Sequence, residues 1–206
     1  ITHFFNPPRY LKLLEIVSSK EVNAETREKI AKFCDIYLGK SIIECKDTPG
    51  FIANRIGVFW MLHAAVKAIN ANLSVEEADQ IIMRVFNAPK TGVFGLIDVV
   101  GLDLLPPVLE SLLQGVSKID DYHEFRDQPD IFQYMLEHNL IGRKADGGFY
   151  KLIELDRKRV KHSLNLNTRE YEVSKKPSIE SLKFGKKDIR SFLDYGDRFS
   201  DYAWSV

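Results

Sequence analysis

Two side chains near the start of the chain, His3 and Glu15, have types that could act together in proton transfer. His3 lies in a short apolar segment, Thr2 to Phe5, just before a pair of prolines. Glu15 interrupts a second apolar run, Leu11 to Val17, at a position where a half-buried strand normally has an apolar residue. If the two segments are neighbouring strands, the carboxylate can bind the imidazole, fix its tautomer and raise its basicity. The pair would then act as a general base.

The spacing of His3 and Glu15 by itself favours a simpler interpretation, in which the two side chains do not interact. Carboxylates in strands mostly face water, so Glu15 could lie exposed on an edge strand and His3 could be a satisfied histidine beside a turn. Asn54 presents a similar choice, since an amide buried in an apolar helix must be hydrogen-bonded. Its partner would be either a neighbouring backbone group or a ligand.

The other histidines and the cysteines do not predict a metal site. His63 lies inside a long apolar segment, where we expect it to pack in the core. The remaining histidines stand apart in polar surroundings, without the spacing of metal ligands. Cys34 and Cys45 are too few for a disulfide framework and are typical of a reducing compartment. We therefore predict no metal.

The elements that would position His3 and Glu15 alternate between strand and helix. Strands are predicted at residues 2–5, 11–17 and 41–45, with a helix at residues 24–38. This order is typical of the last edge of an α/β sheet.

From residue 47 onward the patterns predict helices. Asp47-Thr48-Pro49 is expected to cap a helix whose stretch 51–69 is apolar on nearly every face, as in a buried central helix. Ser74-Val-Glu-Glu77 is a capping box that begins a second helix. Two more helices are predicted near residues 106–114 and 129–138.

The rest of the chain is predicted to be a connector followed by a new helical segment. Short strands are predicted at residues 149–152 and 169–173, and the basic cluster at residues 157–161 is interpreted as a solvated face. We therefore predict a mainly α protein with four parts: the last strands and helix of a Rossmann-type domain (residues 1–47), a helical bundle (48–150), a connector (151–185) and the start of a second helical domain (186–206).

Composition narrows the function. The 206 residues include 29 basic and 29 acidic side chains, so the chain lacks the basic field that would attract nucleic acid. No apolar run is long enough to span a membrane, and the start does not have the pattern of a signal peptide, so we expect a cytoplasmic protein. The glycines form neither G-x-G-x-x-G nor a P-loop, so no dinucleotide cradle is predicted within these residues.

Four motifs then occur in order along the chain: Thr2-His-Phe-Phe-Asn-Pro-Pro8, Lys12-Leu-Leu-Glu-Ile-Val17, Cys45-Lys-Asp-Thr-Pro-Gly-Phe-Ile-Ala-Asn-Arg55 and Asp98-Val-Val-Gly-Leu-Asp103. Together they resemble the L-3-hydroxyacyl-CoA dehydrogenase family of fatty-acid β-oxidation. The resemblance implies an oxidoreductase that converts 3-hydroxyacyl-CoA to 3-oxoacyl-CoA with NAD. It also implies a helical bundle of the 6-phosphogluconate dehydrogenase C-terminal type.

The resemblance implies a role for each matching residue. His3 matches the general base that acts on the 3-hydroxyl of the substrate, and Glu15 matches the carboxylate that pairs with it. Asn6 matches a position close to the nicotinamide of NAD. Asn54 matches the amide near the thioester of the substrate.

The sequence departs from the family pattern in ways that predict a fragment of a longer protein. The glycine-rich turn of the nucleotide-binding half has no counterpart here, and residues 88–94 look more like the long multifunctional enzymes with a fused enoyl-CoA hydratase. We therefore expect an internal fragment that is inactive alone. Its partners in the intact enzyme would be the acyl-CoA substrate, the missing Rossmann domain and a second helical repeat.

A second hypothesis treats the chain as a non-catalytic helical interaction module. Its truncated last domain would leave an apolar face exposed at residues 189–204, and such a face is expected to drive self-association.

Overall fold

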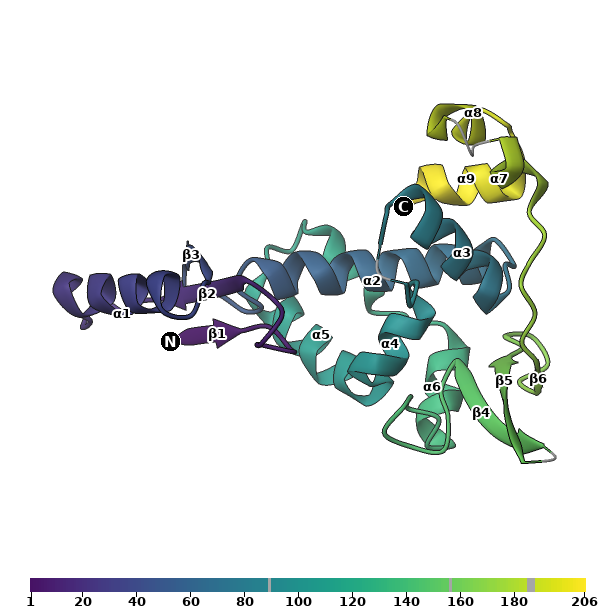
Figure 1. Ribbon diagram of the computed structural model, residues 1–206, viewed down its shortest axis with the longest axis horizontal. Coiled ribbons are helices and arrows are strands. Elements are labelled where there is room, and N and C mark those ends of the chain that lie inside the picture. Colours follow the sequence, from purple (N-terminus) through teal and green to yellow (C-terminus); the bar gives the residue numbers. More distant parts are fainter. Residues whose placement is uncertain (89, 156, 185–187) are drawn as a thin grey trace.

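A computed structural model describes residues 1–206 except 89, 156 and 185–187 (Figure 1). Its first part is a three-stranded sheet of β1 (Thr2–Phe4), β2 (Leu13–Val17) and β3 (Ser41–Cys45), with α1 (Ala24–Ile36) between the second and third strands. β2 is central, antiparallel to β1 and parallel to β3. Buried side chains of β2 and α1, chiefly Leu14, Ile16 and Cys34, form a small core of their own.

The middle of the chain is helical, as predicted. Ser74 and Glu77 form the expected capping box, because each side chain accepts a hydrogen bond from the backbone N–H of the other. The elements are α2 (Ala53–Asn70), α3 (Val75–Val85), α4 (Phe94–Val100), α5 (Leu105–Gly115) and α6 (Asp130–Glu137), with 3₁₀ turns η1 (Leu102–Leu104) and η2 (Asp121–Phe125).

α2 is buried along only part of its length. Its second half supplies Met61, Leu62, Ala64, Ala65 and Ala68 to the main core. Its first half is open, with the Ile56 side chain 65% exposed. The predicted central helix therefore exists, but its first turns present apolar side chains on the surface.

The expectation of a mainly α protein is wrong, because the chain contains a second three-stranded sheet. Helices make up 46% of the residues. β4 (Tyr150–Leu155), β5 (Lys158–Leu164) and β6 (Tyr171–Val173) pair antiparallel in that order. The fold is thus mixed: helices with two small sheets.

β4 and β6 overlap the strands predicted at residues 149–152 and 169–173, but the central strand β5 was not predicted because it is rich in charge. Lys158, Arg159 and Lys161 are exposed, and burial is confined to the last three positions of the strand. A strand with one covered face needs few apolar residues. The sheet is held to the helices by Asp98 of α4, whose two carboxylate oxygens each accept a backbone N–H at 2.8 Å, from Phe149 and from Tyr150.

The end of the chain forms α7 (Glu180–Phe184), α8 (Ile189–Leu193) and α9 (Arg198–Ser205). Asp197 caps α9, because its side chain accepts hydrogen bonds from the backbone N–H groups of Phe199 and Ser200. The predicted exposed apolar face at residues 189–204 is covered in part. Phe192 and Tyr202 are 1% and 2% exposed within the main core, whereas Ile189, Tyr195 and Trp204 are 45%, 44% and 64% exposed. Tyr202 also donates a hydrogen bond to the Ala64 carbonyl of α2 at 3.1 Å. Among the described helices, none combines the length and the apolar character needed to span a bilayer.

Candidate active site

His3 and Glu15 meet across the first sheet. The antiparallel register of β1 and β2 places the two residues directly opposite each other. The His3 Nδ1 lies 2.7 Å from the Glu15 Oε2, a short hydrogen bond. The predicted contact is therefore confirmed, and the exposed-carboxylate alternative is wrong because Glu15 is 0% exposed.

The second oxygen of Glu15 caps the beginning of α2. Its Oε1 accepts backbone N–H bonds from Ile52 at 3.0 Å and from Ala53 at 2.8 Å. The first N–H groups of a helix lack partners within the helix, so a carboxylate there satisfies them and interacts favourably with the helix dipole. The predicted cap from residues 47–49 is wrong: α2 begins at Ala53, and no side chain at its N-cap position makes a capping bond.

The surroundings of Glu15 favour its ionised form. Burial acts to raise its pKa, but the hydrogen bonds from the Ala53 N–H, from His3 and from the Ile52 N–H outweigh burial and bring the pKa below its ordinary value. An ionised carboxylate can only accept hydrogen bonds, so the bound Nδ1 of His3 must be the ring nitrogen with the proton. In the neutral imidazole, Nε2 then holds a free lone pair.

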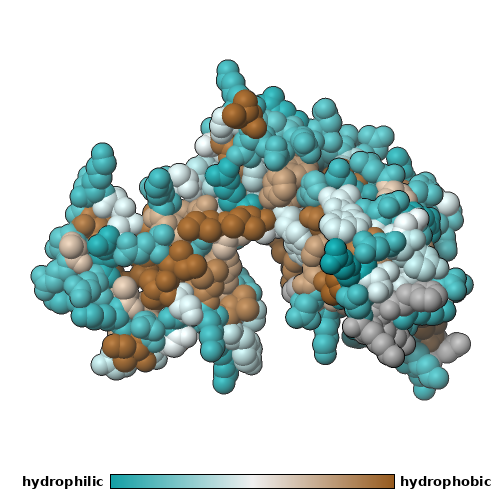
Figure 2. All heavy atoms as spheres, turned by 90° about the horizontal axis from the view of Figure 1, so that it is seen from above, coloured by the Kyte–Doolittle hydropathy of each residue, from teal (hydrophilic) through white to brown (hydrophobic). Residues whose placement is uncertain are grey.

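The imidazole of His3 lies between aromatic rings and is partly open. Its centroid is 4.6 Å from that of Phe5 and 5.7 Å from that of Phe51, and the side chain is 27% exposed. Phe51 also lines an apolar groove of about 560 Å³ that follows the exposed first half of α2. Figure 2 shows apolar side chains in brown in this part of the molecule, beside a hollow. The imidazole thus lies next to Phe51, one of the residues that line this groove.

Cys45 is a further neighbour of the buried carboxylate. Its Sγ lies 3.7 Å from the Glu15 Oε1. Burial, together with the negative charge of Glu15, raises the pKa of the Cys45 thiol. The thiol therefore stays protonated and acts as a weak donor to Glu15.

The two asparagines are exposed, and among the described residues neither side chain forms a hydrogen bond with His3 or Glu15. Asn6 lies two residues beyond the end of β1, and Asn54 is the second residue of α2, directly after the Ala53 whose N–H binds Glu15. Within the described residues the Asn54 amide makes no side-chain hydrogen bond. The expectation that it binds a neighbouring backbone group is therefore not met, and its amide is open to solvent.

The comparison with known families agrees with this geometry. Residues 50–152 match the family model described as "3-hydroxyacyl-CoA dehydrogenase, C-terminal domain", and residues 1–48 match the one described as "3-hydroxyacyl-CoA dehydrogenase, NAD binding domain". The chain belongs to the 3-hydroxyacyl-CoA dehydrogenase family. The resemblance inferred from the motifs is thereby confirmed for residues 1–48 and for residues 50–152.

Two curated relatives of this 3-hydroxyacyl-CoA dehydrogenase chain are much longer than it. It is 42% identical over 201 residues to a putative fatty acid oxidation complex trifunctional enzyme of Rickettsia prowazekii, covering 98% of this chain and 28% of that protein. It is 35% identical to a probable 3-hydroxyacyl-CoA dehydrogenase of Bacillus subtilis, over 100% of this chain and 26% of the relative. The chain thus spans about a quarter of the length of these curated relatives.

A solved structure shares the fold. The (S)-3-hydroxybutyryl-CoA dehydrogenase from Ralstonia eutropha is 30% identical with a TM-score of 0.58, over 71% of this chain and 50% of that one.

NAD is the cofactor named for the family domain at residues 1–48. The residues present fit its reactive end, because His3 offers a proton acceptor among aromatic rings and Asn6 offers an exposed amide. The G-x-G-x-x-G turn that holds a pyrophosphate does not occur in residues 1–206. The fit is therefore restricted to the nicotinamide end.

Sequence reasoning missed the groups that fix Glu15. These are the backbone N–H groups of Ile52 and Ala53, which have no side-chain signature. One indirect signal was available in Pro49-Gly50, since Gly50 has φ +72° and a Cβ there would lie 2.7 Å from Leu112. A glycine under such constraint marks the tight turn that brings the start of α2 against the sheet.

Proposed function

We propose that this chain forms part of an NAD-dependent dehydrogenase that oxidises 3-hydroxyacyl-CoA to 3-oxoacyl-CoA in fatty-acid oxidation. The observation that supports it most is the 2.7 Å bond between His3 Nδ1 and a fully buried Glu15. In this proposal His3 and Glu15 are the catalytic pair, Asn6 lies toward the nicotinamide and Asn54 toward the thioester. The names of the relatives and the family domains support the same reaction.

The residues of the chain divide the proton transfer between them. The His3 Nε2 accepts the proton of the substrate 3-hydroxyl, and the ring becomes an imidazolium. Glu15 stabilises that cation through Nδ1 without changing its own protonation, because its pKa is held low. NAD, when bound, accepts the hydride that leaves C3. The aromatic rings around His3 restrict water near the reacting groups.

A chimera tests this proposal. This chain would replace the aligned segment of the Rickettsia prowazekii relative, which supplies the remaining parts of that protein. Reduction of acetoacetyl-CoA is followed by the absorbance of NADH. We expect the unaltered chimera to be active. In this direction the His3 imidazolium returns its proton to the 3-oxo oxygen, so His3→Ala should lower kcat by about 10² to 10⁴, the usual contribution of general acid–base catalysis.

The matched control replaces His123, which binds the Ser117 carbonyl of its own loop. His123→Ala should leave kcat within about twofold of the unaltered chimera, since surface changes are usually small. A soluble, cooperatively folding chimera without activity would contradict the proposal, as would one in which His3→Ala has no effect on kcat.

We also propose, as a second candidate function, that the isolated chain is an interaction module. It is supported by α1, where Phe33, Ile36 and Tyr37 are 54%, 70% and 76% exposed. Three large apolar side chains on one short helix form a patch of the kind found at interfaces. The occupant we propose is a second copy of the chain, and sedimentation velocity distinguishes self-association from a stable monomer.

A further inference from the structure

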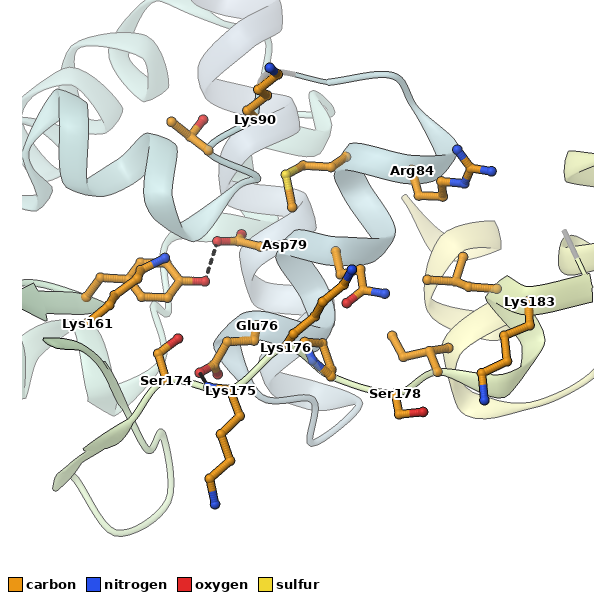
Figure 3. Close-up of a pocket in the computed structure, with 17 residues that line it drawn as sticks. Glu76, Asp79, Arg84, Lys90, Lys161, Ser174, Lys175, Lys176, Ser178 and Lys183 are labelled. Carbon is orange, nitrogen blue, oxygen red and sulfur yellow. Dashed lines mark hydrogen bonds between the residues drawn. The ribbon is translucent and has the colours of Figure 1, made fainter. Parts of the chain in front are cut away.

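A cavity of about 870 Å³ lies between α3, the second sheet, residues 174–178 and α7 (Figure 3). The whole chain has equal numbers of basic and acidic residues, but basic residues outnumber acidic ones among those that line this cavity. Its acidic members are Glu76 and Asp79, and its basic members are more numerous: Arg84, Lys90, Lys161, Lys175, Lys176 and Lys183. Positive charge is therefore concentrated here against a neutral background.

The two carboxylates are already engaged by the protein. The Glu76 Oε1 accepts the Ser163 hydroxyl at 2.5 Å and the Lys175 backbone N–H at 3.3 Å. Asp79 is 3% exposed and accepts the Tyr150 hydroxyl at 2.8 Å, as well as two backbone N–H groups at the start of α4. These bonds hold both carboxylates within the fold. Among the described residues neither forms an ion pair with a lysine of the cavity, although Asp79 interacts electrostatically with Lys161.

The five lysines that line the cavity are not held in close ion pairs among the described residues, although Lys161 interacts electrostatically with Asp79 and Asp98. The Lys161 Nζ lies 3.4 Å from the centroid of the Tyr150 ring, which holds the ammonium at the cavity wall. Figure 3 shows Lys161 and Lys183 on opposite sides, with Lys176 between them.

The remaining lining is polar at one edge and apolar behind it. Ser174 and Ser178 offer hydroxyl groups, and Met83, Ile179 and Leu182 form an apolar wall. Ammonium groups bind phosphate as point charges, and pockets of a few hundred to a thousand Å³ commonly combine apolar walls with a few polar groups.

We propose that this cavity binds a small molecule that carries phosphate groups and rests a flat or apolar part against Met83 and Leu182. A nucleotide and an inorganic polyphosphate share the anionic part of this chemistry. The proposal goes beyond the dehydrogenase function, because none of His3, Asn6, Glu15 or Asn54 lines the cavity. Figure 1 places α3, β5 and α7 at the end of the molecule opposite β1 and β2.

Isothermal titration calorimetry of the chain with pyrophosphate, ADP and adenosine at low salt tests the site. We expect pyrophosphate and ADP to bind, adenosine alone not to bind, and the affinity to fall as NaCl is added, because salt screens exposed charges. Tighter binding of ADP than of pyrophosphate would support a nucleotide ligand. Equal binding would support phosphate recognition alone.

Substitutions then locate the binding. Lys176→Gln combined with Lys183→Gln removes two exposed ammonium groups without disturbing any hydrogen bond of the described residues, and should weaken the binding of ADP by at least about tenfold. Lys20→Gln combined with Lys118→Gln removes the same charge outside the cavity and should leave the affinity unchanged.

Three results would overturn the proposal. The first is the absence of binding heat with both pyrophosphate and ADP at low salt. The second is adenosine binding as tightly as ADP. The third is an equal effect of the two double variants, which would attribute the binding to net charge and not to the cavity.

Discussion

Replacing Glu15 by Gln isolates the role of its charge, because the two side chains have the same shape. The carboxylate accepts bonds from His3 on one oxygen and from Ile52 and Ala53 on the other. If the glutamine keeps its oxygen toward the two backbone N–H groups, its NH₂ group faces the His3 Nδ1. That nitrogen must then accept a hydrogen bond, which moves the ring proton to Nε2 and removes the free lone pair.

The magnitude follows from these contacts. Two backbone hydrogen bonds change from charge-assisted to neutral, and each loses about 1 kcal/mol. A negative charge at the first turn of α2 is lost as well, which removes about 0.3 to 1 kcal/mol. We therefore expect Glu15→Gln to lower the free energy of unfolding by about 2 to 3 kcal/mol at pH 7. For a chain of this length, Tm should fall by about 4 to 12 °C.

Urea denaturation followed by circular dichroism measures this difference, and its pH dependence identifies the cause. The folded-state pKa of Glu15 lies below the ordinary value of 4.5, so the stability it contributes is present above 4.5 and is lost as pH falls through the folded-state pKa. The gap between the two proteins should therefore shrink in acid. The control Glu170→Gln changes an exposed carboxylate and should shift stability by less than about 0.5 kcal/mol. A gap of the same size at pH 7 and at acid pH would refute the assignment to charge.

Three further predictions concern other parts of the molecule. Burial raises the pKa of Asp79 from 3.8 to about 7. The free energy of unfolding of the wild type, compared with that of Asp79→Asn, should therefore fall as pH rises from about 4 to about 7. Urea titrations at these two pH values measure the difference. Lys40 is 7% exposed, and its ammonium donates a hydrogen bond to the Leu11 carbonyl at 2.7 Å. Lys40→Met should therefore lower the free energy of unfolding in urea by about 1.5 to 3 kcal/mol, and Lys40→Arg should lower it by less. An equal loss in both variants would contradict a role for the charge. Because Ile36 and Tyr37 are exposed, we expect self-association that increases with concentration in sedimentation velocity. The double variant Ile36→Glu with Tyr37→Ser should abolish it. A wild-type protein that stays monomeric at every soluble concentration would contradict this prediction.

The elements with strong local signals were predictable from the sequence. β3 was predicted at residues 41–45 and is found there, and the capping box at Ser74 begins α3 as expected. Two strands of the second sheet, β4 and β6, overlap the strands predicted at residues 149–152 and 169–173. β5 was missed, because its charged residues look like a solvated loop until the pairing with β4 is known. Its covered face depends on contacts with α3, far away in the sequence, such as the bond from Ser163 to Glu76.

At the candidate site, too, some features could be predicted from the sequence and others could not. The contact between His3 and Glu15 was one of two interpretations that the spacing left open, and the family resemblance favoured it; the register of β1 and β2 places the two residues opposite each other. The start of α2 could not be predicted, because its cap is supplied by Glu15, 37 residues before Ile52, and no local pattern encodes that bond. The exposure of Asn54 was also hidden, since the apolar sequence of α2 suggested burial over a length that the fold leaves half open. The catalytic roles of these residues stay predictions.

The tautomer of His3 is the most direct test of the account. Two-dimensional ¹H–¹⁵N NMR of the imidazole rings, recorded where they are neutral, distinguishes a protonated Nδ1 from a protonated Nε2. His3→Gln assigns the His3 signals among those of the five histidines. We predict a proton on Nδ1 and a free Nε2 in the wild type, and the opposite tautomer in Glu15→Gln. A wild-type ring with its proton on Nε2 would contradict the proposed general base.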